Sequence, residues 1–193
     1  IMLGPDGNIW FSMTETSRIG RITSSGTITQ FGNGIPSGAR PLSIVVRNNS
    51  LWFSLAAADY IGCLNANGEI NLYPIPTKNS QPRAMTVHPD GSIWFVQTNS
   101  NSLGRIDDTG KMTEYKGTTP EASLRGVVTT ADGEIWATEN FANKIAHMSA
   151  SGKMIGEYDI PTHQSGARCI TSTSKGRIFF TQYDAGSIGE VLR

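Results

Sequence analysis

Residues 90–95 read Asp90-Gly91-Ser92-Ile93-Trp94-Phe95, and a closely related phrase occurs four more times along the chain. Its aromatic residue stands at positions 10, 52, 94, 136 and 179, a spacing of 42 or 43 residues. A second phrase keeps the same period; its copies are Ile19-Gly20-Arg21-Ile22, Ile61-Gly62-Cys63-Leu64, Leu103-Gly104-Arg105-Ile106, Ile145-Ala146-His147-Met148 and Ile188-Gly189-Glu190-Val191. Two markers with one period indicate a structural repeat, whose copies start near residues 5, 47, 88, 130 and 173.

Each period contains four short apolar segments separated by turns. In the third copy we expect strands at residues 84–87, 92–96, 102–106 and 111–115, with turns at 88–91 and 107–110. Asp-Gly and Asn-Gly pairs favour such hairpin turns because glycine accepts a positive φ without a Cβ clash. No segment keeps the 3.6-residue period of a helix. Four antiparallel strands (a to d, from the axis outward) in every period predict an all-β fold, a β-propeller of four-stranded blades.

The extent of the repeat predicts how much of a propeller the chain contains. Residues 1–3 match the end of a strand a, and residues 187–192 match a strand c. We therefore expect about four and a half blades of a larger disc, forming a single β-propeller domain over residues 1–193. Because the chain begins with Ile1 rather than Met, we also expect it to be an N-terminally incomplete fragment.

Composition excludes several classes of function. Lys plus Arg and Asp plus Glu are both 16, so the net charge is zero, whereas nucleic-acid-binding domains usually carry a basic surplus. No apolar run approaches the ~20 residues of a membrane-spanning helix. The 38% hydrophobic content is too high for a disordered chain. The partner predicted is a small molecule, not a nucleic acid or a membrane. Cys63 and Cys169 lack metal-ligand spacing and are expected to be small buried side chains.

The longer d–a and b–c connections are expected on one face of the disc, where binding is usually built. On that face the third residue of each strand-a phrase is Leu42, Arg83, Arg125 or Arg168. Because strand a is innermost, we predict that Arg83, Arg125 and Arg168 converge on a funnel and bind a carboxylate, an ester carbonyl or a phosphate. The alternative is that they are solvated or paired with acids.

Polar residues also recur three positions after the aromatic marker, as Gln97, Glu139 and Gln182. A carboxylate among amides could ligate Mg²⁺, which prefers oxygen donors, so Glu139 is the candidate metal ligand. An ion pair between Glu139 and one of the arginines is the alternative. His163 lies in a d–a loop on the same face and is a weak candidate for a catalytic residue. The tryptophans and isoleucines of the two phrases are expected to form the core between blades.

The phrases Asp-Gly-x-Ile-Trp-Phe and Ile-Gly-Arg-Ile, with the loop Glu139-Asn140-Phe141-Ala142-Asn143-Lys144, resemble the virginiamycin B lyase (streptogramin B lyase) family over essentially the whole chain. The resemblance implies a seven-bladed propeller, monomeric when complete and cytoplasmic. It also implies resistance to a cyclic depsipeptide antibiotic, whose ester is opened by Mg²⁺-dependent elimination rather than hydrolysis.

The sequence departs from this family at the residues that carry the chemistry. The family's histidines stand in Pro-His-Gly/Ala-Ile phrases at the start of strand a, where this chain has Arg83, Arg125 and Arg168. Arginine stays protonated and cannot act as the base. Two hypotheses follow: a carbon–oxygen lyase whose base lies elsewhere, or a binding propeller whose arginines hold an anionic ligand without turnover. A hydrolytic, gluconolactonase-like propeller is a weaker third, because the metal-binding acids that it needs are not evident.

Overall fold

The computed structural model describes residues 1–192, in which all regular secondary structure is β-strand. The strands are β1 (Met2–Leu3), β2 (Ile9–Met13), β3 (Arg18–Ile22), β4 (Ile28–Phe31), β5 (Pro41–Arg47), β6 (Ser50–Leu55), β7 (Tyr60–Leu64), β8 (Ile70–Pro74), β9 (Pro82–Val87), β10 (Ile93–Gln97), β11 (Ser102–Ile106), β12 (Met112–Lys116), β13 (Leu124–Thr129), β14 (Ile135–Glu139), β15 (Lys144–Met148), β16 (Met154–Asp159), β17 (Ala167–Ser172), β18 (Ile178–Gln182) and β19 (Ser187–Val191). Within these residues there is no helix long and apolar enough to cross a membrane.

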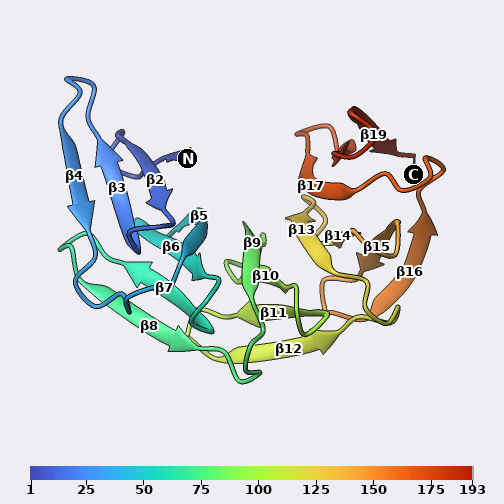
Figure 1. Ribbon diagram of the computed structural model, residues 1–193, viewed down its shortest axis with the longest axis horizontal. Helices are drawn as coiled ribbons and strands as arrows, with labels where there is room; N and C mark the ends of the chain where they lie inside the picture. Colours follow the sequence, from blue (N-terminus) through green and yellow to red (C-terminus); the bar gives the residue numbers. More distant parts are fainter. Residues whose placement is uncertain (193) are drawn as a thin grey trace. The chain divides into compact units, whose positions relative to one another are not determined.

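The strands form five antiparallel sheets in which consecutive strands are neighbours (Figure 1). Four sheets have four strands, β1 to β4, β5 to β8, β9 to β12 and β13 to β16, and the last has the three strands β17 to β19. Each sheet is therefore a chain of hairpins, as in a propeller blade. The prediction of an all-β fold of antiparallel blades is confirmed, and the four strands expected in the third copy are found with ends shifted by one or two residues.

The chain divides into two compact units, residues 1–85 and 86–193, and the boundary falls within β9. In the first unit the core gathers Trp10, Phe53 and Leu55. In the second unit one core cluster gathers Trp136, Ile178 and Phe180. Burial of each such side chain contributes roughly 1.5–3 kcal/mol, so these aromatic and aliphatic residues hold the sheets together, as expected.

The glycine of the Ile-Gly-Arg-Ile phrase makes room for the phenylalanine of the Trp-Phe phrase. A Cβ at Gly104 would lie 2.1 Å from the ring of Phe95, its cross-strand neighbour. The same ring-on-glycine contact occurs at Gly20, Gly62 and Gly189. In the sheet β13 to β16 both members change, because Ala137 pairs with Ala146. The ring is lost and a methyl group replaces the glycine hydrogen, so this sheet lacks the buried phenylalanine of the others.

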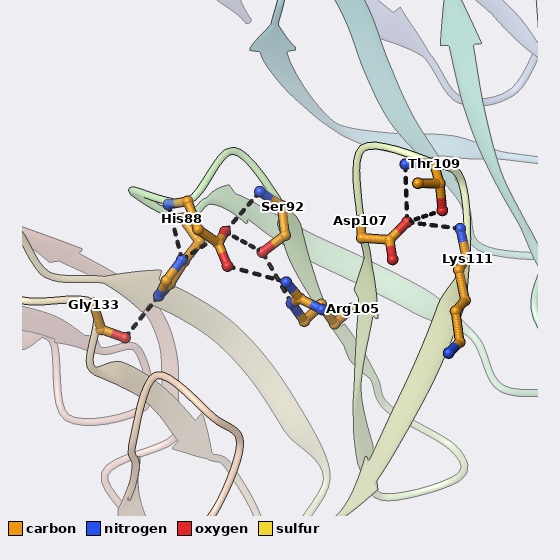
Figure 2. Close-up of polar contacts among 8 residues, drawn as sticks. His88, Ser92, Arg105, Asp107, Thr109, Lys111 and Gly133 are labelled. Atoms are coloured by element: carbon orange, nitrogen blue, oxygen red, sulfur yellow. Dashed lines mark hydrogen bonds and ion pairs between the residues drawn. The ribbon is translucent and has the colours of Figure 1, made fainter.

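The aspartate of the a–b turn binds the arginine of strand c. Asp90 Oδ2 accepts a 3.0 Å hydrogen bond from Arg105, and the other oxygen accepts from the backbone and hydroxyl of Ser92 (Figure 2). Burial opposes ionisation of Asp90, but these hydrogen bonds outweigh it and hold its pKa well below the usual range. His88 Nε2 hydrogen-bonds to the carbonyl oxygen of Gly133 in the next a–b turn. The repeated polar residues of the phrases therefore have a structural role.

The prediction that both cysteines are buried is correct for Cys63 and wrong for Cys169. Cys63 is buried on β7, but Cys169 is exposed on β17. Cys169 lies beside Thr171 and Ile188, and the side chains of all three residues are exposed.

Candidate ligand site at the strand bulges

Three of the strands a, β5, β13 and β17, interrupt their ladder, and on β13 and β17 the interruption falls at an arginine. On β13, Leu124 pairs with Glu139 and Val127 pairs with Ala137, so two residues, Arg125 and Gly126, face the single residue Thr138. A β-bulge of this kind bends the strand and redirects a side chain, and bulges are common beside functional sites. The same interruption occurs in two other sheets. On β17, Arg168 and Cys169 face the single residue Thr181 of β18, and on β5, Leu42 and Ser43 face Ser54 of β6.

A hydroxyl group opposite each bulge satisfies the N–H that the bulge frees. Thr138 Oγ1 accepts from the backbone N–H of Gly126 at 2.8 Å, and Thr181 Oγ1 accepts from that of Cys169 at 3.0 Å. Ser54 Oγ does the same for Ser43 at 3.1 Å. The bond at Gly126 is buried, and a buried N–H without a partner is costly, so Thr138 fixes the bulge that carries Arg125. The bond from Cys169 to Thr181 is exposed to solvent and stabilises the bulge of Arg168 less.

The two arginine-bearing bulges lie on neighbouring strands of the second unit. Thr138 Oγ1 donates to the carbonyl oxygen of Arg168 at 2.7 Å, which joins the bulge of β13 to that of β17. A Cβ on Gly126 would lie only 2.3 Å from the same carbonyl oxygen, so only glycine permits this approach. The structure therefore places Arg125 and Arg168 at equivalent positions on adjacent strands.

The two guanidinium groups differ in their surroundings. The Arg168 guanidinium carbon lies 3.6 Å from the ring centroid of Tyr183, and both side chains are exposed. A stacked guanidinium keeps its in-plane N–H donors free for an acceptor. Arg125 is half-buried, and its buried Nε–H has no hydrogen-bond partner among residues 1–192. A buried N–H of this kind is ready to be satisfied by a bound oxygen.

Arg83 belongs to the other unit and has a different environment. It is half-buried on β9, its Nε donates to Gln81 Oε1 at 3.5 Å, and it lines a small pocket of about 170 Å³ with Arg40 and Leu42. The convergence of all three arginines on one funnel stays a prediction, and the structure shows Arg125 and Arg168 at equivalent positions on adjacent strands.

A groove of about 700 Å³ opens beside the bulge of β17. Its lining includes Asn140, Phe141, His163, Gly166 and Asp184. Phe141 is 73% exposed, an unusual environment for a phenylalanine. Gly166 stands two residues before Arg168, and its φ of 64° and the 2.2 Å that would separate a Cβ from Asp184 both require glycine. His163 therefore lines this groove, and its catalytic role stays a prediction.

Glu139 is fully buried at the end of β14, and neither carboxyl oxygen has a hydrogen-bond donor among residues 1–192. Burial, and then the facing carboxylate of Glu157, raise its pKa to about 7. Glu157 stays acidic despite partial burial, because Thr118 and Thr119 donate to it and lower its pKa. The expected alternative, an ion pair with an arginine, is not found for Glu139 among these residues.

The fit of Mg²⁺ to these residues can be judged from the donors. Residues 1–192 contain no group of three His, Cys, Asp or Glu side chains arranged to hold a metal ion. Glu139 and Glu157 nevertheless present carboxyl oxygens, with the two Thr118 and Thr119 hydroxyls beside them, which is the oxygen chemistry that a hard divalent cation prefers. Because Glu139 is fully buried, a cation there would be structural and would not reach a ligand at the arginines.

Two threonines, a tyrosine and a glutamate of this region were missed by sequence reasoning. Thr138 and Thr181 shape the bulges, Tyr183 stacks on Arg168, and Glu157 faces Glu139. A signal for the first two exists, because a hydroxyl residue stands two positions after the aromatic marker at Ser54, Thr138 and Thr181.

Repeated antiparallel sheets, two of which carry an arginine at the bulge of their first strand, define the chain as part of a β-propeller. The chain belongs to the virginiamycin B lyase family, whose model matches residues 1–193. It is 31% identical to selenomethionine-substituted virginiamycin B lyase from Staphylococcus aureus, with a TM-score of 0.94 over 100% of this chain and 65% of that one.

Two further structures agree with this assignment. A catalytically inactive histidine-to-alanine variant of the Staphylococcus aureus lyase with quinupristin is 31% identical, with a TM-score of 0.93 over 99% of this chain and 65% of that one. A streptogramin B lyase structure is 32% identical, with a TM-score of 0.89 over 100% and 67%. The chain thus spans about two thirds of the length of these proteins. A search of curated proteins finds no significant match.

Proposed function

We propose that this member of the family binds a cyclic depsipeptide of the streptogramin B type, with Arg125 and Arg168 holding its ester or carboxylate oxygens. The observation that carries the proposal is the pair of arginines at equivalent bulges on adjacent strands. Guanidinium groups donate two parallel hydrogen bonds to a carboxylate, and charge-assisted bonds of this kind contribute about 1.5–3 kcal/mol each.

The chemistry of the two arginines favours binding over proton removal. Neither can accept a proton, so neither replaces a histidine base. What they can do is neutralise negative charge on a ligand oxygen, Arg125 through its unpartnered Nε–H and Arg168 through a guanidinium held against Tyr183. The groove lined by Phe141 and His163 lies next to Arg168 and offers an aromatic surface for the rest of the ligand.

The second candidate function is the family's ring-opening elimination, favoured by the 31% identity to the quinupristin-containing lyase over 99% of this chain. In that reaction a proton leaves the carbon next to the one that bears the ester oxygen, a C=C bond forms, and the ester departs as a carboxylate. Arg125 and Arg168 would stabilise the departing carboxylate, and His163 is the described residue that could accept the proton. Mg²⁺ is implied by the family resemblance, and no step is assigned to it.

The experiment compares binding and turnover on the same samples. The protein is incubated with quinupristin and MgCl₂, binding is measured by calorimetry, and the ligand is analysed by chromatography with tandem mass spectrometry. Binding that weakens at least tenfold in Arg125→Ala and Arg168→Ala, but not in the control Arg177→Ala, supports the proposal. Elimination gives an opened ring of unchanged mass, whereas hydrolysis adds one water. Equal binding by all four proteins would overturn the assignment of the arginines.

A further inference from the structure

The sheet β13 to β16 differs from its neighbours at one buried position that the proposed function does not use. Glu139 on β14 is equivalent to Gln97 on β10 and Gln182 on β18, because each of these residues stands three positions after the aromatic residue of its repeat. All three side chains are buried. An amide carries its own N–H donors, whereas a carboxylate has none, so only Glu139 brings a potential negative charge into the interior.

The register of the sheet puts a second carboxylate on the same face. Ala137 pairs with Ala146 and Ala146 pairs with Glu157, while Glu139 pairs with Lys144 and Lys144 with Asp159. Glu139 on β14 and Glu157 on β16 therefore lie on one face of the sheet, in neighbouring rows of paired residues and with β15 between their strands. The carboxyl groups are close enough for Glu157 to raise the pKa of Glu139. This is the face where the other sheets have a phenylalanine ring on glycine and this sheet has only Ala137 and Ala146.

The surroundings supply oxygen atoms and an excess of negative charge. Glu157 accepts hydrogen bonds from the hydroxyl groups of Thr118 and Thr119, and from the backbone N–H of Thr119 at 3.1 Å. The nearest cation, Lys144, is already paired with Asp159 at 2.8 Å. Three carboxylates thus share one lysine, and both oxygens of the most buried of them, Glu139, have no donor among residues 1–192.

We propose that Glu139, Glu157, Thr118 and Thr119 form a structural site for a hard divalent cation, Mg²⁺ or Ca²⁺. The cation would bridge the two carboxylates, with the threonine hydroxyls as further oxygen ligands and water on the half-exposed side of Glu157. It would tie β14 and β16 to residues 118–119, which connect the sheet β9 to β12 with the sheet β13 to β16. The site is independent of the arginines.

The test measures cation binding and stability rather than activity. Calorimetric titration of the EDTA-treated protein with CaCl₂, and separately with MgCl₂, should show one equivalent bound. The bound cation should raise the Tm by about 2–4 °C or more when it stabilises by 1 kcal/mol or more. Glu139→Gln and Glu157→Gln should each weaken binding at least tenfold and abolish the rise in Tm.

The design keeps the outcomes separable. Glu139→Gln copies the residues found at 97 and 182, so we expect it to fold, and Glu121→Gln is the control because Glu121 is exposed in the same connection. If neither cation changes the Tm, and Glu139→Gln raises the Tm, the two acids merely share a proton. That result would overturn the cation site. Cation binding that survives in Glu139→Gln would overturn it as well. Neither result depends on whether quinupristin binds.

Discussion

Thr138 donates a 2.7 Å hydrogen bond from its hydroxyl to the backbone carbonyl oxygen of Arg168 on the neighbouring sheet. The Thr138 hydroxyl oxygen also accepts a hydrogen bond from the N–H of Gly126, so one fully buried side chain fixes the bulge of β13 and its contact with β17. The position of Arg168 is therefore set partly by a residue that cannot touch a ligand itself.

Thr138→Val is expected to lower the free energy of unfolding by about 1–3 kcal/mol, because it leaves a buried N–H and a carbonyl group without partners. It should also weaken ligand binding through displacement of the two bulges. Thr138→Ser keeps the hydroxyl and is expected to cost less in both measurements. Urea unfolding gives the stabilities, and equal losses in both variants would argue that the methyl group, not the hydroxyl, is what matters.

Gly126→Ala is expected to destabilise the second unit by about 1–3 kcal/mol, since its Cβ would overlap the carbonyl oxygen of Arg168 and force β13 and β17 apart. A suitable comparison is Gly156→Ala on β16, where a Cβ would lie 3.3 Å from the hydroxyl of Tyr158 and meet no backbone atom. Thermal unfolding of both variants checks the prediction. It is wrong if Gly126→Ala retains the Tm of the unmodified protein.

Arg125→Ala should separate stability from binding. The lost side chain is half-buried and forms no ion pair among residues 1–192, so the free energy of unfolding should fall by only about 0–1 kcal/mol. Ligand affinity should fall by about 1.5–3 kcal/mol, or roughly 10- to 150-fold. Chemical unfolding and calorimetry on one preparation provide both values. A variant that unfolds yet binds normally per folded molecule would refute a ligand role for Arg125.

The lowered pKa of Asp6 predicts that the protein loses folding stability in acid. Burial opposes its ionisation, but hydrogen bonds from Asn8 and from Trp10 Nε1 outweigh burial and lower its pKa to about 2, below the usual 3.8. The contribution of the Asp6 carboxylate to the free energy of unfolding is therefore present above pH 3.8 and disappears as the pH falls through 2. Because Asp6 is partly exposed, Asp6→Asn should cost under about 1 kcal/mol at pH 7 and almost nothing at pH 2. A cost that is the same at both pH values would contradict this; Asp108→Asn, in an exposed turn, serves as the control.

The blades could be predicted from the sequence because their signals are local. A short apolar run and a Gly-containing turn each depend on neighbouring residues, and their recurrence every 42 or 43 residues marks the repeat. The strands expected at 84–87, 92–96, 102–106 and 111–115 appear within two residues of those positions. The ring-on-glycine contact also explains the Phe and Gly of the two phrases, since one requires the other.

The candidate site was only partly predictable because its geometry depends on register and burial. The sequence places Arg125 and Arg168 at the same point of the repeat, yet a bulge is a mismatch in register between two strands, which only the folded sheet shows to be what the recurring hydroxyl residues stabilise. Glu139 looked like a loop carboxylate facing the arginines, whereas it is fully buried and faces Glu157, 18 residues further along the chain. Such pairings arise from the folded sheet and not from spacing in the repeat.

The hydrogen bonds between successive sheets have a consequence for how the molecule opens. The Thr98 hydroxyl donates to the carbonyl oxygen of Leu124 and the Thr138 hydroxyl to that of Arg168, spans of 26 and 30 residues, so the sheet β13 to β16 is hydrogen-bonded to the sheets before and after it in the chain. In repeat proteins of this kind, stability adds up from contacts between neighbouring repeats. Amide hydrogen exchange should accordingly be slower on β14, which β13 and β15 flank within its sheet, than on β16, which lies at the edge of that sheet.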